Sequence, residues 1–188
     1  KKTEQNQFCL AFPSSPISSE DRFAVNLLAS VLGGGVSSRL FQNIREKYGL
    51  CYSIFAFQST FIDTGLLSVA TAVNKETEIK TLGLIGDELK LFVDKGISED
   101  ELKRAREQAK SSLVMSLEST NSRMLKMGNS LLALGKCLTP DELIERYDAV
   151  SSEQILDLAR NRFDFSQMSL SALGKTVSSE DYTKALGL

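Results

Sequence analysis

The sequence predicts an α+β fold, in which a mostly antiparallel β-sheet is covered on one face by helices. Apolar and polar residues alternate in early and late stretches, as they do in strands, while apolar residues recur at helical spacing through the long middle of the chain. No low-complexity segment or interdomain linker interrupts these patterns. Because 188 residues with 42% hydrophobic side chains suffice for one buried core, we expect residues 1–188 to form a single domain.

The first expected elements are a short strand and a helix. Residues 7–12 predict a strand that ends at the cluster of Pro13 and Pro16, since proline cannot donate to a ladder. Residues 18–32 predict a helix with acidic residues in its first turn and an apolar stripe at helical spacing. The glycines at 33–35 end this helix.

A second, short helix follows the glycines. Ser37 or Ser38 can cap it, and Gly49 is the natural left-handed residue after its last turn. The glycine run could also cradle a phosphate. However, it lacks the Lys-Ser/Thr pair of a P-loop and follows a helix, so a structural role is favoured. The predicted apolar face comprises Leu40, Phe41, Ile44 and Tyr48.

The pattern then changes to that of a β-hairpin. Residues 51–61 alternate as a strand, the turn signal IDTG follows, and residues 66–73 alternate again. The alternation predicts that Tyr52, Ile54 and Ala56 face one way, and that Phe55, Phe57, Ser59 and Phe61 face the other.

Helical spacing returns after the hairpin, in two long helices. The first is closed by Gly96, and its predicted inner face comprises Ile79, Leu82, Ile85, Leu89 and Phe92. The second opens with a capping box from Ser98 to Glu101. Its predicted inner face comprises Leu102, Ala105, Ala109, Leu113 and Leu117.

Three shorter helices and a strand complete the chain. One helix is expected over about 123–134. The next has Thr139 as its cap and Pro140 at its first position, and the third is capped by Ser151 or Ser152. Residues 168–174 predict a final strand.

The composition excludes several classes of function. The chain has no histidine, so it can form no Ser-His-Asp triad, no Cys-His pair and no imidazole metal ligand. Its formal net charge of -2, with both signs interspersed, provides no basic stripe for phosphates. No apolar run is long enough to span a bilayer, and the first residues lack the pattern of a signal peptide. We therefore expect neither nucleic acid nor membrane as a partner.

The cysteines and carboxylates offer weaker candidates for chemistry. Cys9, Cys51 and Cys137 are odd in number and far apart, which favours buried thiols in a reducing compartment and predicts a cytoplasmic location. Cys51 could be a nucleophile, but no histidine can activate it, so a packed thiol is favoured. Two carboxylate pairs stand at helix starts, where we expect them to be solvated and not to act as acids or bases. They are Glu99 with Glu101 and Asp141 with Glu142.

Arg45 and Tyr52 are the more interesting pair. They lie seven positions apart, across the end of the short helix and the Gly49 turn. Such a turn can place a guanidinium beside a phenol at one edge of a sheet, where their donors suit a carbonyl or carboxylate. From the residues alone, a surface arginine near Glu46 and a strand tyrosine that reaches solvent remain the simpler interpretation.

The segment LGGGVSSRLFQNIREKYGLCYSIFAF resembles the signature of the pitrilysin/insulysin and mitochondrial-processing-peptidase family of zinc metallopeptidases, the inverzincins. Four further segments resemble the family in the same order: SEDELKRAREQAKSSLVMSLES, RMLKMGNSLLALGK, YDAVSSEQILDLARNRF and LSALGK. The resemblance covers essentially all 188 residues.

The resemblance implies a role in a larger peptidase. Residues 1–188 would be the C-terminal, non-catalytic half-domain of a longer or two-chain enzyme, whose homologous halves pair around an enclosed chamber. Zinc would lie on an H-x-x-E-H motif in the catalytic half, so no catalytic or metal-binding residue is expected in this chain. Arg45 and Tyr52 would reach across the chamber to bind the peptide substrate near that zinc and stabilise its developing oxyanion.

Two other functions are compatible with the resemblance. The family includes non-enzymatic core proteins of a respiratory complex, so the chain could be a scaffold subunit. It could also be a regulatory, peptide-binding half of a protein without a zinc motif. Retention of both Arg45 and Tyr52 favours the peptidase, since a scaffold has no need for the pair. The start at Lys1, just before the first strand, fits a domain taken from a longer polypeptide.

Overall fold

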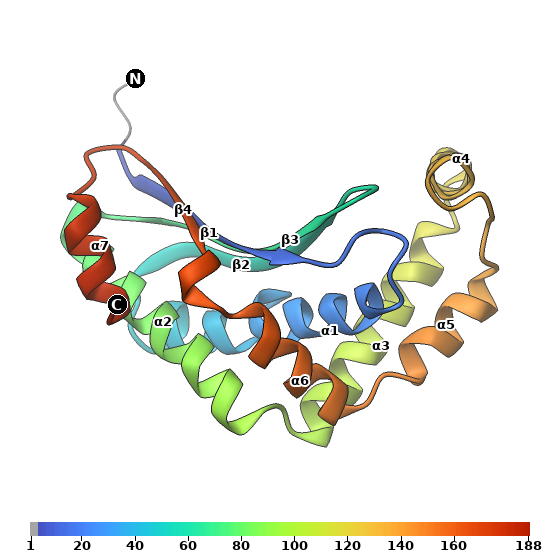
Figure 1. The fold of residues 1–188 in the computed structure, drawn as a ribbon, viewed down its shortest axis with the longest axis horizontal. Coiled ribbons are helices and arrows are strands. Elements are labelled where there is room, and N and C mark those ends of the chain that lie inside the picture. The colour runs from blue at the N-terminus through green and yellow to red at the C-terminus, as the bar shows by residue number, and fades with distance from the viewer. Residues whose placement is uncertain (1–3) are drawn as a thin grey trace.

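A computed structural model describes residues 4–188, and it places helices on one face of an antiparallel sheet (Figure 1). The strands are β1 (Asn6–Ser14), β2 (Cys51–Thr60), β3 (Gly65–Val73) and β4 (Ser169–Leu173). Their spatial order is β2-β3-β1-β4, and each neighbouring pair is antiparallel. The predicted α+β class is therefore confirmed, and β2 lies at one edge of the sheet.

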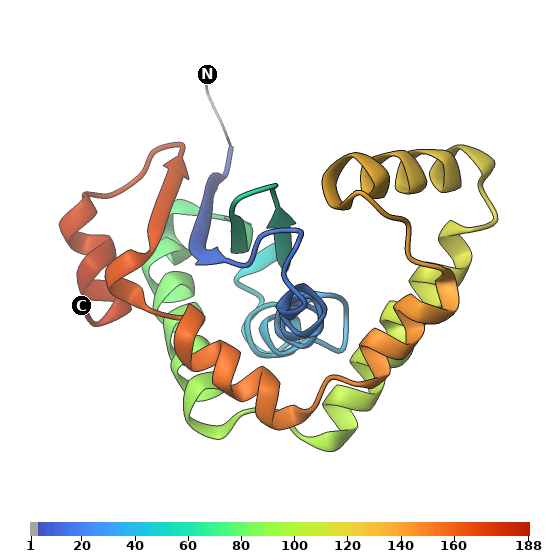
Figure 2. The ribbon, with the colours of Figure 1, turned by 45° about the vertical axis from the view of Figure 1, so that its right-hand side comes forward.

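The helices lie on the inner face of this sheet or extend from it. Those of residues 4–188 are α1 (Asp21–Gly33), α2 (Glu78–Lys95), α3 (Glu99–Ser116), α4 (Thr120–Leu134), α5 (Pro140–Asp148), α6 (Ser152–Arg162) and α7 (Ser179–Leu186). α1, α2 and α6 lie beneath the sheet, whereas α3 leads away from it and carries α4 at its far end (Figures 1 and 2). Short helical turns follow β3 and α6, namely η2 (Lys75–Thr77) and η3 (Phe165–Gln167).

The core lies between the sheet and these helices. Every second residue of β1 points inward, so Phe8, Leu10 and Phe12 are buried while their neighbours are more exposed. They pack with Leu27 of α1 and Leu89 of α2, which are also buried. Removing this apolar surface from water is the main force that holds the helices to the sheet.

The predicted caps of α3, α5 and α6 are confirmed. Ser98 and Glu101 form the predicted capping box of α3, and Thr139 caps α5 with Pro140 at its start. Ser151, of the two candidates, caps α6 by accepting from the backbone N–H of Gln154 at 3.1 Å. Such caps depend on residues three positions apart, so the sequence alone reveals them.

Two predictions in the first half of the fold are wrong. β1 continues through Pro13 to Ser14, because β4 pairs only with Gln7–Ala11 and leaves that edge of β1 free at the proline. Ile79 lies on α2 but is 38% exposed, because the buried face of the helix begins with Glu78 and continues through Leu82 and Ile85.

Helix α7 was not predicted from the sequence. It packs against α2, where the buried Tyr182 hydroxyl donates to the carboxylate of Glu78. Asn6 of β1 also donates to Glu78 through its side-chain amide, at 2.8 Å. Burial and the Glu78 carboxylate together raise the pKa of Tyr182 to about 12. This buried polar contact fixes the last helix to the first strand.

Candidate functional site

The glycine run lets α1 approach β2 closely. A Cβ atom added to Gly33 would lie 2.3 Å from the backbone nitrogen of Ala56, so only glycine fits there. One added to Gly34 would meet the backbone of Ser30 at 2.6 Å, whereas one added to Gly35 would make an ordinary 3.6 Å contact with Gln108. The run therefore has the structural role that was favoured over a phosphate cradle.

The short helix after the glycines is a π-helix, η1 (Phe41–Glu46). The backbone N–H of Lys47 donates to the carbonyl of Gln42, five residues earlier, at 3.0 Å. π-Helical turns are rare in proteins, and those that occur are often found at functional sites. Neither Ser37 nor Ser38 caps η1: the Ser38 hydroxyl instead donates to the carbonyl of Gly35 at 2.6 Å.

The apolar face of η1 is narrower than predicted. Leu40 and Ile44 are fully buried, Phe41 is half-buried and Tyr48 is exposed. Gly49 then turns the chain with a φ of 62°, in the left-handed region that was predicted for it.

A β-bulge at the start of β2 determines where Tyr52 points. Cys51 pairs with Val73 and Ser53 pairs with Ala72, so Tyr52 is an extra residue without a partner across the ladder. The bulge reverses the alternation, so Cys51 is buried and Tyr52 is 76% exposed. The predicted placement of Tyr52 on the same face as the buried Ile54 and Ala56 is therefore wrong.

The π-helix and the bulge bring Arg45 and Tyr52 together. The guanidinium carbon of Arg45 lies 5.2 Å from the ring centre of Tyr52 and 4.6 Å from that of Phe41. The guanidinium thus contacts the faces of two aromatic rings, which attract a cation. The Nε atom of Arg45 lies 3.9 Å from a carboxylate oxygen of Glu46, which is too long for a hydrogen bond. The N–H donors of Arg45 are therefore largely free. Sequence reasoning did not identify Phe41 as part of this cluster.

Cys51 packs beneath the site. Its thiol is buried, and burial raises its pKa, although Thr71 and Arg45 act in the opposite direction. Thr71 also donates its hydroxyl to the carbonyl of Ser53 at 2.8 Å, which secures the bulge. The expected packed thiol is what the structure shows.

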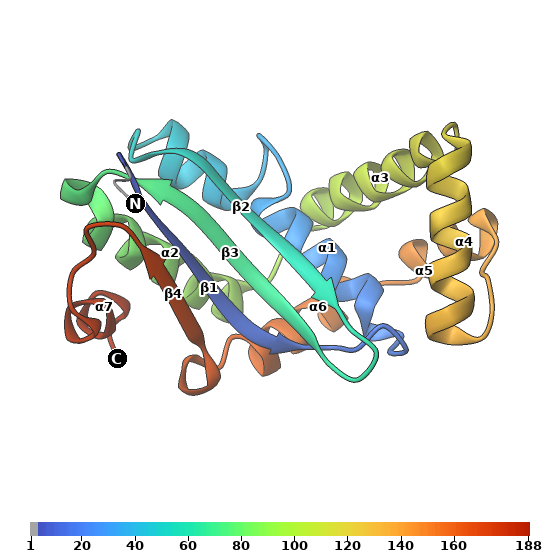
Figure 3. The ribbon, with the colours of Figure 1, turned by 90° about the horizontal axis from the view of Figure 1, so that it is seen from above.

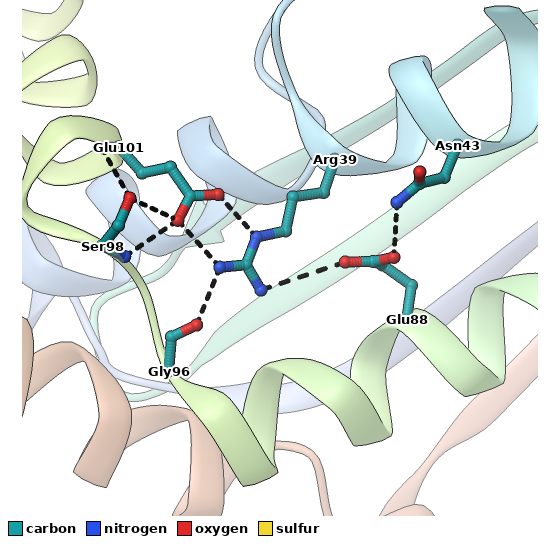
Figure 4. A network of polar contacts seen from close by, with 6 residues as sticks. All are labelled: Arg39, Asn43, Glu88, Gly96, Ser98 and Glu101. Carbon is teal, nitrogen blue, oxygen red and sulfur yellow. Dashed lines mark hydrogen bonds and ion pairs between the residues drawn. The ribbon is translucent and has the colours of Figure 1, made fainter. Parts of the chain in front are cut away.

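A second polar cluster holds η1 against α2 and α3 (Figure 4). Arg39 donates to both carboxylate oxygens of Glu101, at 2.7 and 2.9 Å, and to the carbonyl of Gly96 at 2.7 Å. A carboxylate oxygen of Glu88 lies 3.9 Å from a guanidinium nitrogen of Arg39. The other carboxylate oxygen of Glu88 accepts a hydrogen bond from the side-chain amide of Asn43 at 2.8 Å. The cluster therefore joins three elements just before the turn that carries Arg45.

This cluster corrects one sequence-based expectation. Glu101 is not simply solvated, because its hydrogen bonds from Arg39 lower its pKa to about 2. A carboxylate with so low a pKa is a poor proton donor and a weak base at neutral pH, which does not favour an acid or base role.

The outer face of the sheet is open on the side where Tyr52 projects. A shallow cavity of about 410 Å³ lies across it. Its lining includes Gln7, Cys9, Ser53, Phe55, Ala70, Ala72, Ser171 and Leu173. The exposed rings of Phe55 and Phe57 lie 5.7 Å apart along β2. Small side chains in the middle of the sheet and aromatic ones at its edge thus form a trough.

The described residues do not fit a zinc ion. The chain has no histidine, and residues 4–188 contain no group of three or more cysteine, aspartate or glutamate side chains that could hold a metal. Over the same residues, each helix is too short or too polar to cross a membrane.

Comparisons with known proteins identify the family of this chain. The family model of the peptidase M16 inactive domain matches residues 1–109. The zinc protease YmxG of Bacillus subtilis is 40% identical over 165 residues, which are 87% of this chain and 40% of that protein. A zinc protease of Rickettsia felis is 35% identical over 169 residues, again 87% of this chain and 40% of the relative. The chain thus spans about 40% of the length of these relatives.

Solved structures share the fold. The peptidase M16 inactive domain from Pseudomonas fluorescens superposes with a TM-score of 0.80 at 22% identity, covering 95% of this chain and 43% of that one. A conserved protein from Enterococcus faecalis superposes with a TM-score of 0.79 at 25% identity, covering 95% and 41%. The resemblance to the zinc metallopeptidase family is confirmed, and the chain belongs to the family of peptidase M16 inactive domains.

Proposed function

We propose that this chain is the substrate-binding, non-catalytic half of a zinc-dependent endopeptidase, and that it forms an enclosed chamber with a homologous catalytic half. Members of the family pair a catalytic half with an inactive one. The contact between Arg45 and Tyr52 is the observation that carries the proposal. It sets the half-buried guanidinium of Arg45 beside the exposed phenol of Tyr52 at the end of an edge strand, where a peptide can approach.

The two side chains suit complementary tasks. Arg45 has its guanidinium face against two rings, so its planar N–H edge is fixed in direction and can donate to a peptide carbonyl. Tyr52 projects from the bulge and can donate its hydroxyl to the oxygen that becomes negative as the peptide bond is attacked. Zinc in the other half would activate the attacking water. An extended peptide could also pair with the free edge of β2.

A scaffold subunit is the alternative from a different functional class. Complex III2 from Candida albicans contains a chain that superposes with a TM-score of 0.85 at 16% identity, which shows a shared fold. A scaffold needs no fixed, exposed Arg-Tyr pair, so the cluster favours the peptidase. The sequence of the homologous half separates the two, since only a peptidase needs H-x-x-E-H there.

The test is cleavage of a quenched fluorescent peptide library by the full-length protein, or by this chain with its partner. We expect zinc-dependent cleavage that a chelator abolishes and that Arg45→Ala strongly reduces. Arg160→Ala is the matched control, because Arg160 is an exposed arginine of α6 whose guanidinium lies 3.8 Å from the carboxylate of Asp157. If the zinc-loaded wild type cleaves no peptide, the scaffold subunit becomes the favoured function.

We also propose a cytoplasmic location, which fractionation of the source cells can check.

A further inference from the structure

Helix α4 divides its apolar and polar residues between two halves of its surface. At 3.6 residues per turn, one half is apolar from its second turn to its end. It comprises Met124, Leu125, Met127, Gly128, Leu131, Leu132 and Leu134. The other half comprises Ser122, Arg123, Lys126, Asn129, Ser130 and Ala133. In a helix that packs on its own domain, the apolar half faces inward.

The polar half of α4 faces the body of this chain. Lys126 lines a cleft of about 570 Å³ between α4, α1 and the far end of β2. A second cavity of about 490 Å³ lies against α3 and α5, and α4 lines it with four residues of its polar half and with Met127 and Leu134. The four polar-half residues are Arg123, Lys126, Asn129 and Ser130. Burial lowers the pKa of Lys126. The ammonium group of Lys126 thus lies on the side of α4 that faces the body of the chain, where a surface helix ordinarily has apolar residues such as leucine.

The apolar half of α4 faces away from the body. None of the residues of α4 is buried. Five large side chains of its apolar half are between 52% and 86% exposed, namely Met124, Leu125, Met127, Leu131 and Leu132. An apolar surface of this kind marks an interaction site. The two methionines suit such a surface, because their flexible side chains adapt to a partner.

The position of α4 relates it to the candidate site. α4 stands beyond the β2–β3 hairpin, raised from the layer of α1, α2 and α6 to the level of the sheet (Figures 1 and 2). Figure 3 looks onto the outer face of the sheet and shows α4 beside it. Tyr52 and the exposed rings of Phe55 and Phe57 belong to that face. α4 and the outer face therefore bound the same side of the molecule.

We propose that the apolar half of α4 is the surface on which the homologous half of the peptidase docks. This inference rests on the proposed function, since it requires that half to exist. A body that seats on α4 and reaches across the outer face of the sheet closes a space over Arg45 and Tyr52. The arm formed by α3 and α4 then sets the separation of the two halves at that end of the chamber.

The homologous half fits this surface better than a second copy of the chain does. The relatives carry more than half of their length outside the matched region, on the same polypeptide. A surface on the same polypeptide is present at a high effective concentration, so it outcompetes a second molecule.

The experiment places a photo-crosslinking amino acid, benzoylphenylalanine, at Leu132 in the full-length protein or in the complex of the two halves. Asn129, on the polar half of the same helix, is the matched control position. A second measurement compares backbone hydrogen exchange of residues 120–134 in wild type, Leu132→Arg and Asn129→Arg. We expect crosslinks from position 132 to the homologous half, and about tenfold faster exchange of α4 in Leu132→Arg only.

The remaining outcomes overturn the inference. Crosslinks from position 132 to a second copy would assign the surface to self-association. No crosslink, with equal exchange in the three proteins, would show that α4 is uncovered. Either result leaves the proposed function intact if peptide cleavage still depends on Arg45. Loss of that dependence, with α4 crosslinked to the homologous half, would instead contradict the proposed function alone.

Discussion

The guanidinium carbon of Arg45 lies 5.2 Å from the ring centre of Tyr52, although a helix end, a left-handed glycine and a strand start separate them. Two departures from regular structure produce this contact. The π-helical turn changes the direction in which Arg45 projects, and the bulge turns Tyr52 out of the core. The contact between Arg45 and Tyr52 therefore coincides with two irregularities of the backbone, one in a helix and one in a strand.

Removing the Tyr52 hydroxyl tests its role in the transition state. We expect Tyr52→Phe to lower the turnover of the full-length enzyme by roughly ten- to a thousandfold, the range for one lost oxyanion donor. Steady-state kinetics on a single fluorescent peptide measures the change. Tyr48→Phe is the control, since Tyr48 is an exposed tyrosine of the same turn, whose ring faces Lys47 and Lys80. Unchanged kinetics of Tyr52→Phe would leave Tyr52 as a surface tyrosine.

Replacing Phe41 tests how Arg45 is held. We expect Phe41→Leu to lower kcat/KM by about fivefold, because the guanidinium loses one ring face worth about 1 kcal/mol. Phe41→Tyr keeps the ring and should retain activity. Since Phe41 acts through Arg45, the loss should vanish when Phe41→Leu is added to Arg45→Ala. Additive losses in that double variant would show that Phe41 has a separate role.

Gly49 makes the corner between the two side chains. A Cβ atom at Gly49 would meet no other atom within 4 Å, so the φ of 62° is what restricts the position. We expect Gly49→Ala to lower the free energy of unfolding by about 1–2 kcal/mol, the cost of a left-handed L-residue. Gly49→Asn should recover most of this loss, because asparagine adopts that conformation more readily. Equal denaturant midpoints for all three proteins would contradict the prediction.

Replacing Arg39 tests how much the polar cluster contributes to the stability of the fold. Arg39→Met leaves the carboxylates of Glu88 and Glu101 without their cation, so we expect a loss of about 3 kcal/mol in the free energy of unfolding. Chemical denaturation at pH 7 measures it. Arg160→Met removes an exposed arginine and should change stability by less than about 1 kcal/mol. Similar losses in the two variants would show that the Arg39 contacts contribute little.

The same contact predicts a dependence on pH. The pKa of Glu101 is lowered from 4.5 to about 2, so its contribution to stability is full above about pH 4.5 and is lost as the pH falls toward 2. In Arg39→Met that pKa returns toward its ordinary value. The stability difference between wild type and Arg39→Met should therefore shrink between pH 4.5 and 2. A difference that stays constant over this interval would contradict the assignment.

Features that depend on neighbouring residues could be predicted from the sequence. Both capping boxes link residues three positions apart, and the left-handed turn depends on Gly49 alone. The resemblance carried the choice of Arg45 and Tyr52, and the structure places the two side chains in contact. Their role in catalysis stays a prediction until it is measured.

Features that depend on distant pairing could not be predicted in this way. The bulge exists because Cys51 pairs with Val73, so the direction of Tyr52 is set across the hairpin and not by alternation within β2. Glu101 finds Arg39 across 62 positions of sequence. Helix α7 has eight residues, too few for a periodic apolar pattern to stand out.

The three cysteines differ in ways that matter for handling the protein. Cys51 is buried, Cys9 is partly buried and burial raises its pKa, whereas Cys137 is exposed. Cys137 lies just after α4 and contacts the carbonyl of Met127 at 3.3 Å. A maleimide dye should therefore attach first at Cys137, because its thiol is the most accessible. The native chain thus provides its own attachment point for a fluorescent reporter, without an engineered cysteine, at the place where movements between the two halves would be read most directly.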